Sequence, residues 1–239
     1  MQGSIQKIKG FSKVLQHENL KEEDWEVFDI SPSVSGDLGV FPGDTSFGLT
    51  NQLDFDKGHN LRLNTVTTTL HIGAHVDAPC HYVQNGSAMG AVSLRPYLGA
   101  ALVITAHVKP GTRVGIDDLD PKWINQQIPT RILIRTNSFK DPCQWNSDFC
   151  ALEPSLVHFF DSKGVILIGI DTPSVDFEDS KDLLCHAAFA KTGIAILEGI
   201  VLSSVTDGLY ELIALPLRLR DADASPVRAV LRRRFTKHE

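Results

Sequence analysis

The chain has 239 residues, of which 42% are hydrophobic, and a formal net charge of −6. This length suits a single domain, since α/β domains often reach about 250 residues, and a chain of this size needs no structural metal or disulfide to fold. The acidic balance argues against a nucleic-acid-binding protein, which would carry a basic face. The four cysteines form no C-x-x-C pair, which argues against a zinc ribbon or a dithiol redox site.

Compartment and domain organisation follow from simple patterns. No apolar stretch approaches the roughly 18 residues of a membrane span, and the first 24 residues have no apolar core of the kind found in signal peptides. Scattered thiols fit a reducing compartment, so we expect a soluble, cytoplasmic protein. We interpret residues 1–24, which are polar and charged, as an N-terminal extension, and residues 25–239 as one domain.

The predicted elements begin with a β-type run at 25–30, followed by a turn-rich loop at 31–50 that holds five glycine and proline positions between Gly36 and Gly48. Two helices are expected, at 153–162 and at 179–191; the second would begin at Asp179 or Ser180 and end at Gly193. Strands interspersed with few helices predict an α/β domain with a mixed sheet. Segments rich in Val, Ile, Leu and Thr predict further strands at 64–71, 100–107, 131–136, 165–170, 194–198, 209–215 and 227–233.

The most informative segment runs from His71 to His81 and reads H-I-G-A-H-V-D-A-P-C-H. The strand expected at 64–71 would end on His71, and His75 and Asp77 would point to the same side of an extended chain. Neutral imidazole and carboxylate are ligands for zinc, iron or manganese. A single histidine is more often packed or hydrogen-bonded, but three histidines and an aspartate at this spacing favour a metal site.

A second cluster combines His186, within the later predicted helix, with Glu198, which interrupts an apolar run at 194–200. A buried carboxylate costs several kcal/mol unless it is paired or bound to a metal. Glu198 would therefore bind a metal or pair with an arginine such as Arg228, and the sequence does not choose between them. His186 taken alone is typical of a packed helix residue.

Several of these residues match the sequence motifs of a known family. The segment from His71 to His81 resembles the H-x-G-T-H-x-D-x-P-x-H signature of the cyclase-type metal-dependent hydrolases, and among these the bacterial kynurenine formamidases (arylformamidases). The F-P-G-D sequence that begins at Phe41 resembles that family's W-P-G-D loop, and His186 followed twelve residues later by Glu198 has the family's spacing. Further resemblance lies in segments 167–174, 210–217 and 225–231.

The resemblance implies a fold of the swivelling β/β/α type, a homodimer and a binuclear site with two Zn²⁺ per chain, for which Mn²⁺ is an alternative. His71 and His75 would bind the first metal and His186 the second. Asp77 and Glu198 would bridge both metals. The resemblance further implies a proton-transferring His81, a substrate contact at Phe41, and a site border at Asp171 and Ser174, although these last two residues also fit a merely structural turn.

The implied reaction is the hydrolysis of N-formyl-L-kynurenine to L-kynurenine and formate in tryptophan catabolism. A hydroxide held between the two metals would attack the formamide, and His81 would protonate the leaving nitrogen. Two positions depart from the family pattern: Ala74 replaces a threonine and Phe41 a tryptophan that contacts the aryl substrate. Phe41 keeps an aromatic wall but no indole N–H, so another amide, such as an isatin-like lactam or a cyclic imide, remains an alternative.

Two alternatives belong to other classes. His75, Asp77 and His186 also match the two-histidine, one-carboxylate triad of Fe(II) oxygenases, a reading that leaves the other ligand-type residues of both clusters unexplained. The other is a non-catalytic domain that binds a metal or a small molecule, which leaves three classes in all: hydrolase, oxygenase and binding domain. Iron-dependent oxygen uptake and a hydrolysis assay distinguish the three.

Overall fold

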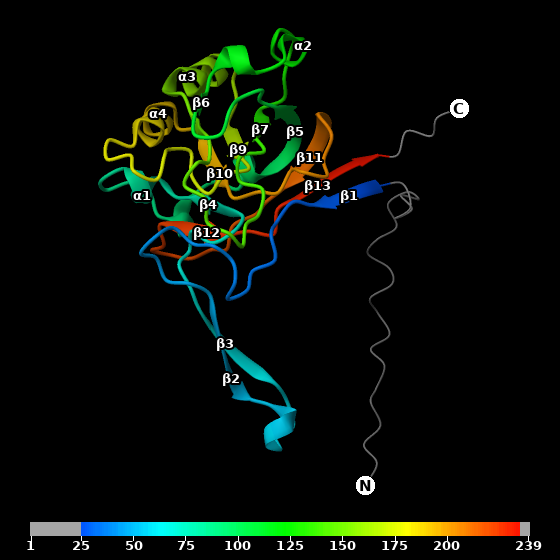
Figure 1. Ribbon diagram of the computed structural model, residues 1–239, viewed down its shortest axis with the longest axis vertical. Helices are drawn as coiled ribbons and strands as arrows, with labels where there is room; N and C mark the ends of the chain where they lie inside the picture. The colour runs from blue at the N-terminus through cyan, green and yellow to red at the C-terminus, as the bar shows by residue number, and fades with distance from the viewer. Residues whose placement is uncertain (1–24, 235–239) are drawn as a thin grey trace.

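A nine-stranded mixed sheet forms the frame of the protein in the computed structural model, which describes residues 25–234 (Figure 1). The four central strands run parallel, and antiparallel strands flank them on both sides. The predicted α/β domain with a mixed sheet is therefore confirmed. In spatial order the strands are β1 (Trp25–Asp29), β13 (Val230–Arg234), β11 (Gly208–Ile213), β5 (Leu98–Thr105), β7 (Arg131–Arg135), β9 (Leu167–Ile170), β10 (Ala195–Glu198), β4 (His75–Asp77) and β12 (Ala224–Pro226).

The parallel strands form because their sequences are apolar on both faces, which is typical of strands covered on both sides. Along β7, Ile132 and Ile134 belong to one hydrophobic core and Leu133 to the other, as the two-residue period of a strand requires. The helices α3 (Pro154–Ser162) and α4 (Leu184–Thr192) contribute to the first core and lie together on one side of the sheet (Figure 1). The second core joins residues of the parallel strands, such as Leu133 and Leu167, with residues of the antiparallel strands, such as Leu212.

Smaller elements connect this frame. The short helix α1 (Pro79–Tyr82) follows β4, and β6 (Arg113–Val114) pairs in parallel with β8 (Ala151–Leu152). The remaining short helices are α2 (Pro121–Ile124), η3 (Phe55–Lys57), η4 (Met89–Ala91), η5 (Arg95–Tyr97) and η6 (Ile116–Asp118). None of the helices in the described part of the chain is long and apolar enough to cross a membrane.

A hairpin of β2 (Gly48–Leu53) and β3 (Leu63–Thr67) projects away from the body of the molecule (Figure 1). Nearly all of its residues are exposed, including the apolar side chains of Leu49, Phe55 and Val66, whose exposed fractions are 53%, 62% and 53%. Two-stranded hairpins are only marginally stable alone in water, so a hairpin that exposes its apolar side chains in this way would be expected to pack against another surface.

The structure corrects two sequence-based boundaries. The strand expected at 64–71 ends at Thr67, so His71 lies in the irregular turn 68–74 and not at a strand end. Helix α4 begins at Leu184 instead of near 179, because Leu183 adopts a left-handed conformation (φ 44°). Its end at Gly193 is confirmed. The proposed extension at 1–24 lies outside the described residues.

Candidate metal centre

Strand β4 presents His75 and Asp77 to the same side, as expected for residues two apart in a strand. Both side chains are buried, with His75 Nε2 3.7 Å from Asp77 Oδ1. The neighbouring strand β10 runs antiparallel, and its Glu198 is the partner of His75 in the register. As a result, Glu198 Oε2 lies 3.1 Å from His75 Nε2, and Arg228 pairs with Asp29 instead. The arginine alternative for Glu198 is therefore wrong.

The turn 68–74 brings His71 back against β4. Gly73 has a positive φ of 56°, a conformation that glycine adopts without steric cost. The turn packs tightly on the end of β10, since a Cβ atom added to Gly199 would lie 2.0 Å from the carbonyl oxygen of Gly73. This close approach positions His71 Nδ1 3.1 Å from Asp77 Oδ1.

Helix α4 delivers His186 from the opposite side, with its Nε2 atom 3.6 Å from Asp77 Oδ2. The two oxygens of Asp77 thus face different histidines: Oδ1 faces His71 and His75, and Oδ2 faces His186. This is the arrangement that a carboxylate bridging two metals would have. All five metal ligands predicted from the sequence come together in the structure.

Each of these histidines has its outer ring nitrogen held by an oxygen. His75 Nδ1 lies 2.9 Å from the carbonyl oxygen of Gly73, His186 Nδ1 lies 2.9 Å from Asp176 Oδ2, and His71 Nε2 lies 3.1 Å from Asp223 Oδ2. Metal-ligating histidines almost always make such a contact, which fixes the tautomer and the ring orientation. The remaining nitrogens point inward, toward Asp77.

The inner atoms test whether these residues fit a metal. His75 Nε2 and both carboxylate oxygens of Asp77 are buried and form no hydrogen bond, even though ionisable groups lie 3.1–3.7 Å away. Buried polar atoms are normally paired, because an unpaired one is costly. Ligand atoms of His71, His75 and Asp77 lie within 4.8 Å of one another, as do those of Asp77, His81 and His186. The site therefore fits a divalent cation.

Two further details concern the predicted roles. Glu198 is in neither of these groups: its Oε1 accepts a hydrogen bond from the amide of Val175 at 2.7 Å, while Oε2 faces His75. His81, which the resemblance implies is not a ligand, lies close enough to Asp77 and His186 to share a cation with them.

The buried carboxylates stabilise positive charge in the site. Burial lowers the pKa of His71, but Asp77 and Asp223 outweigh this effect and raise it to about 9. Burial also lowers the pKa of His186, but Asp176 and Asp77 outweigh this effect and raise it to about 10. Metal binding would displace these protons. His81 differs, because burial dominates there and lowers its pKa.

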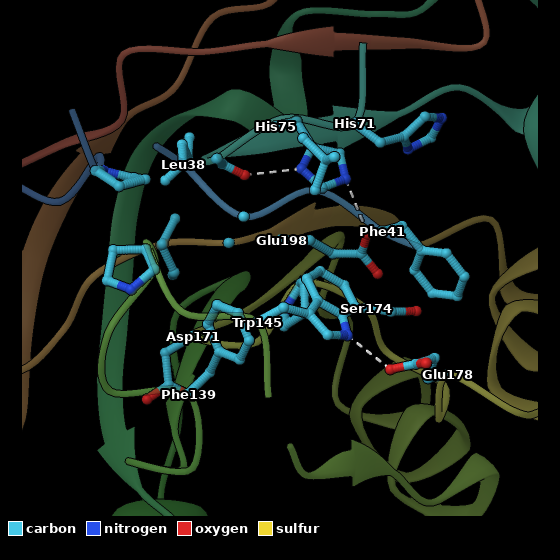
Figure 2. Close-up of a pocket in the computed structure, with 18 of the residues that line it drawn as sticks. Leu38, Phe41, His71, His75, Phe139, Trp145, Asp171, Ser174, Glu178 and Glu198 are labelled. Carbon is cyan, nitrogen blue, oxygen red and sulfur yellow. Dashed lines mark hydrogen bonds and ion pairs between the residues drawn. The ribbon is translucent and has the colours of Figure 1, made fainter. Parts of the chain in front are cut away.

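A cavity of about 840 Å³ opens onto this centre, and the predicted site residues Phe41, Asp171 and Ser174 line it. Figure 2 shows His75 and Glu198 in contact at the cavity, with Phe41 and Trp145 beside them. Asp171 has a structural task as well: its buried carboxylate accepts hydrogen bonds from the amides of Thr136 and Asn137, each at 2.9 Å. Burial raises the pKa of Asp171.

Sequence reasoning missed several residues of the site: Asp176 and Asp223 behind the histidines, and Phe139, Trp145 and Glu178 in the cavity wall. Phe139, Trp145, Glu178 and Asp223 lie in loops with no motif around them. Asp176 lies in the loop before α4, and its carboxylate accepts hydrogen bonds from the first amides of that helix, a contact that only the structure shows.

Comparison with known proteins agrees with the fold. A family model described as a putative cyclase matches residues 22–177. A predicted metal-dependent hydrolase from Bacillus stearothermophilus is 22% identical with a TM-score of 0.73, covering 87% of this chain and 98% of that chain. Isatin hydrolase A from Labrenzia aggregata, bound to benzyl benzoate, is 19% identical with a TM-score of 0.73, covering 87% and 93%. An isatin hydrolase bound to the product analogue thioisatinate is 16% identical with a TM-score of 0.73, covering 89% and 94%. At these identities the likeness shows the fold alone.

Proposed function

This chain belongs to the putative cyclase family, and from that premise we propose that it is a metal-dependent hydrolase of aromatic amides. The observation that carries the proposal is the set of buried, unpaired ligand atoms on His75 and Asp77 beside a large cavity. His71, His186 and Glu198 complete the ligand set that we propose, with Zn²⁺ as the first candidate and Mn²⁺ as the second. When bound, the metal would supply Lewis-acid polarisation of the amide carbonyl and a lowered pKa for water.

His81 is the residue that we propose to move the proton. It lines the cavity from α1 and is the one histidine of the centre whose pKa is lowered. A neutral imidazole accepts the proton of the attacking water, and the resulting imidazolium returns it to the leaving nitrogen. The arrangement separates three histidines that would bind metal as neutral ligands from one that changes its protonation state during the reaction.

The cavity supports an aromatic substrate. A volume of about 840 Å³ lies within the usual range for small-molecule sites, and aromatic side chains, Phe41, Phe139 and Trp145 among them, line it. N-formyl-L-kynurenine, a linear aryl amide, is the substrate that we propose first. Isatin, a cyclic aryl amide, is the second, because three of the similar folds are isatin hydrolases and Phe41 lacks the indole N–H of the formamidase loop.

A second copy of the chain is the partner that we propose. The hairpin comprises residues 48–67, and its exposed apolar residues find no cover in the described part of the chain. Standard protein interfaces use about 20–30 residues on each side, so an arm of this length can form most of one side. A closed two-fold arrangement would cover both arms at once.

The test is hydrolysis by protein of known metal content. N-formyl-L-kynurenine and isatin are each incubated with the zinc-loaded, manganese-loaded and metal-stripped protein, and product absorbance is followed. We expect turnover that a chelator abolishes and added metal restores. Turnover by the metal-stripped protein would refute the metal dependence, while failure on both substrates with metal bound would refute the aryl amide. Iron-dependent oxygen uptake would instead support the oxygenase alternative.

A further inference from the structure

One wall of the cavity is built from aromatic rings supplied by two loops. Phe41 comes from the loop after β1, and Phe139 and Trp145 come from the loop between β7 and β8. The Trp145 ring packs edge-on against Phe41 at 5.5 Å and against Phe139 at 5.7 Å between ring centroids. Trp145 is therefore the ring that joins the other two, and all three are half-buried, with part of each ring open to the cavity.

The loops that carry these rings are fixed to one another. The amide of Gly39 donates a hydrogen bond to the carbonyl oxygen of Pro142 at 2.9 Å, and a Cβ atom at Gly39 would lie 3.1 Å from that same oxygen. Behind the wall, the fully buried ring of Phe149 contacts Trp145 at 6.1 Å. The wall thus has a fixed backing, which a selective surface requires.

Trp145 is the one ring of the wall with a polar anchor. Its indole Nε1–H donates to Glu178 Oε2 at 2.7 Å (Figure 2), and Glu178 belongs to a third loop, after β9. A buried or half-buried indole N–H normally needs such a partner. Because Glu178 takes this donor, the indole presents ring surface to the cavity and no free N–H group.

We propose that Trp145 is the residue by which this cavity selects planar aromatic rings, and that Glu178 is its positioning residue. The inference rests on the proposed function only in placing the amide at the metal centre. Offset or edge-on aromatic contacts favour a planar ring over a saturated ring of equal size by about 2- to 12-fold in affinity. A puckered ring cannot lie along the indole face and so loses this contribution.

The experiment compares two amides that share an anchor and differ in their ring. The dissociation constants of benzamide and cyclohexanecarboxamide are measured by calorimetry on the metal-loaded wild-type protein and on variants. In the wild type we expect benzamide to bind more tightly by a factor within that range. Trp145→Leu brings the ratio close to one, while Trp145→Phe, which keeps a ring but loses the N–H contact with Glu178, gives an intermediate ratio.

Glu178 supplies a matched pair that leaves all three aromatic rings of the wall in place. Glu178→Gln retains an oxygen acceptor for the indole N–H and is expected to keep the wild-type ratio. Glu178→Leu removes the acceptor, so the ratio is expected to fall about halfway toward that of Trp145→Leu. This pair decides the matter if Trp145→Leu does not fold. Trp25→Leu, outside the cavity, is the control for loss of a tryptophan.

The proposal is overturned if Trp145→Leu, folded and metal-loaded, retains the wild-type preference, or if the two Glu178 variants give equal ratios. It is also overturned if the wild type binds neither amide, or binds both equally. Because the readout is binding, a protein that hydrolyses no aryl amide would refute the proposed function and leave this ratio intact. Conversely, a wild-type protein that hydrolyses an aryl amide but binds benzamide and cyclohexanecarboxamide equally would refute this proposal and leave the proposed function intact.

Discussion

Asp176→Asn is the substitution that tests the candidate metal centre most sharply, because it changes one charge behind a ligand and little volume. Asp176 is fully buried and accepts hydrogen bonds from the amides of Cys185 and His186 and from His186 Nδ1, at 2.9–3.1 Å. It also pairs with Arg113 at 3.2 Å. An asparagine offers one oxygen to these donors and turns an NH₂ group toward the rest.

The magnitude has two parts. Loss of a carboxylate that orients a metal-ligating histidine typically costs 10- to 100-fold in metal affinity or activity. Leaving one partner of a buried ion pair unmatched costs about 3 kcal/mol or more in stability, and the Arg113 side chain is only 21% exposed. We therefore expect Asp176→Asn to lower both the metal affinity and the unfolding free energy.

The assay keeps these effects apart. Metal affinity is measured by competition with a chromophoric chelator, and stability by denaturant unfolding of the metal-free protein. Arg113→Gln is the control, because it removes the ion pair but keeps the contact between Asp176 and His186: stability should fall and metal affinity should not. If folded Asp176→Asn bound metal within about twofold of the wild type, the role assigned to Asp176 would be refuted.

Three further predictions follow from the site and the hairpin. His81→Ala should retain its metal and lose about 10²–10⁴-fold in turnover, whereas Asp77→Ala should lose metal and turnover together; equal metal loss in both, measured by metal analysis, would contradict the division of roles. In the metal-free protein, the pKa values of His71 and His186 are raised to about 9 and about 10. The stability that the two protonated histidines contribute is therefore complete below about pH 6.5 and is lost as the pH rises through 9 to 10. Denaturant unfolding of the metal-free protein across this range should show the decline, and a stability that rises with pH there would argue against it. Leu49 and Val66 are cross-strand partners on the hairpin, and replacing both with lysine should yield a monomer in light scattering with metal affinity unchanged. Lysines at the adjacent pair Thr50 and Thr65 serve as the control. A dimer that survives the replacement of Leu49 and Val66 would exclude this face of the hairpin from the interface.

The fold could be predicted where a pattern had room to repeat. The apolar runs of β7, β9 and β10 lie within two residues of the predicted strands, because a strand buried on both faces leaves a continuous hydrophobic signal. Strands β4 and β12 have three residues each, too few to show a period of two. Strand β4 pairs with the edge that β10 offers, and β12 pairs in turn with β4, which is information from the tertiary structure.

The site shows the same limit at the level of single residues. The ligands His75 and Asp77 follow from local spacing, and the support of His75, the carbonyl of Gly73, is two residues away. The support of His71 is Asp223, 152 residues along the chain, and no local pattern connects them. The chain alone can thus propose a histidine as a candidate ligand, while the partner that fixes its tautomer and orientation can lie far away in the sequence, as it does for His71.

Asp176 is an intermediate case. The prediction placed the start of the helix near Asp179 and did not identify Asp176 as the partner of His186, and both errors have the same cause. Asp179 and Ser180 have the residue types of an N-cap, so the sequence favours them. The left-handed Leu183 instead delays the helix to Leu184, and the first amides then point at the carboxylate of Asp176. Because the oxygen that accepts these amides also holds His186 Nδ1, the start of α4 and the orientation of its ligand depend on the same group. The residue that accepts the first amides of α4 is therefore also a determinant of how His186 is presented to the candidate metal centre.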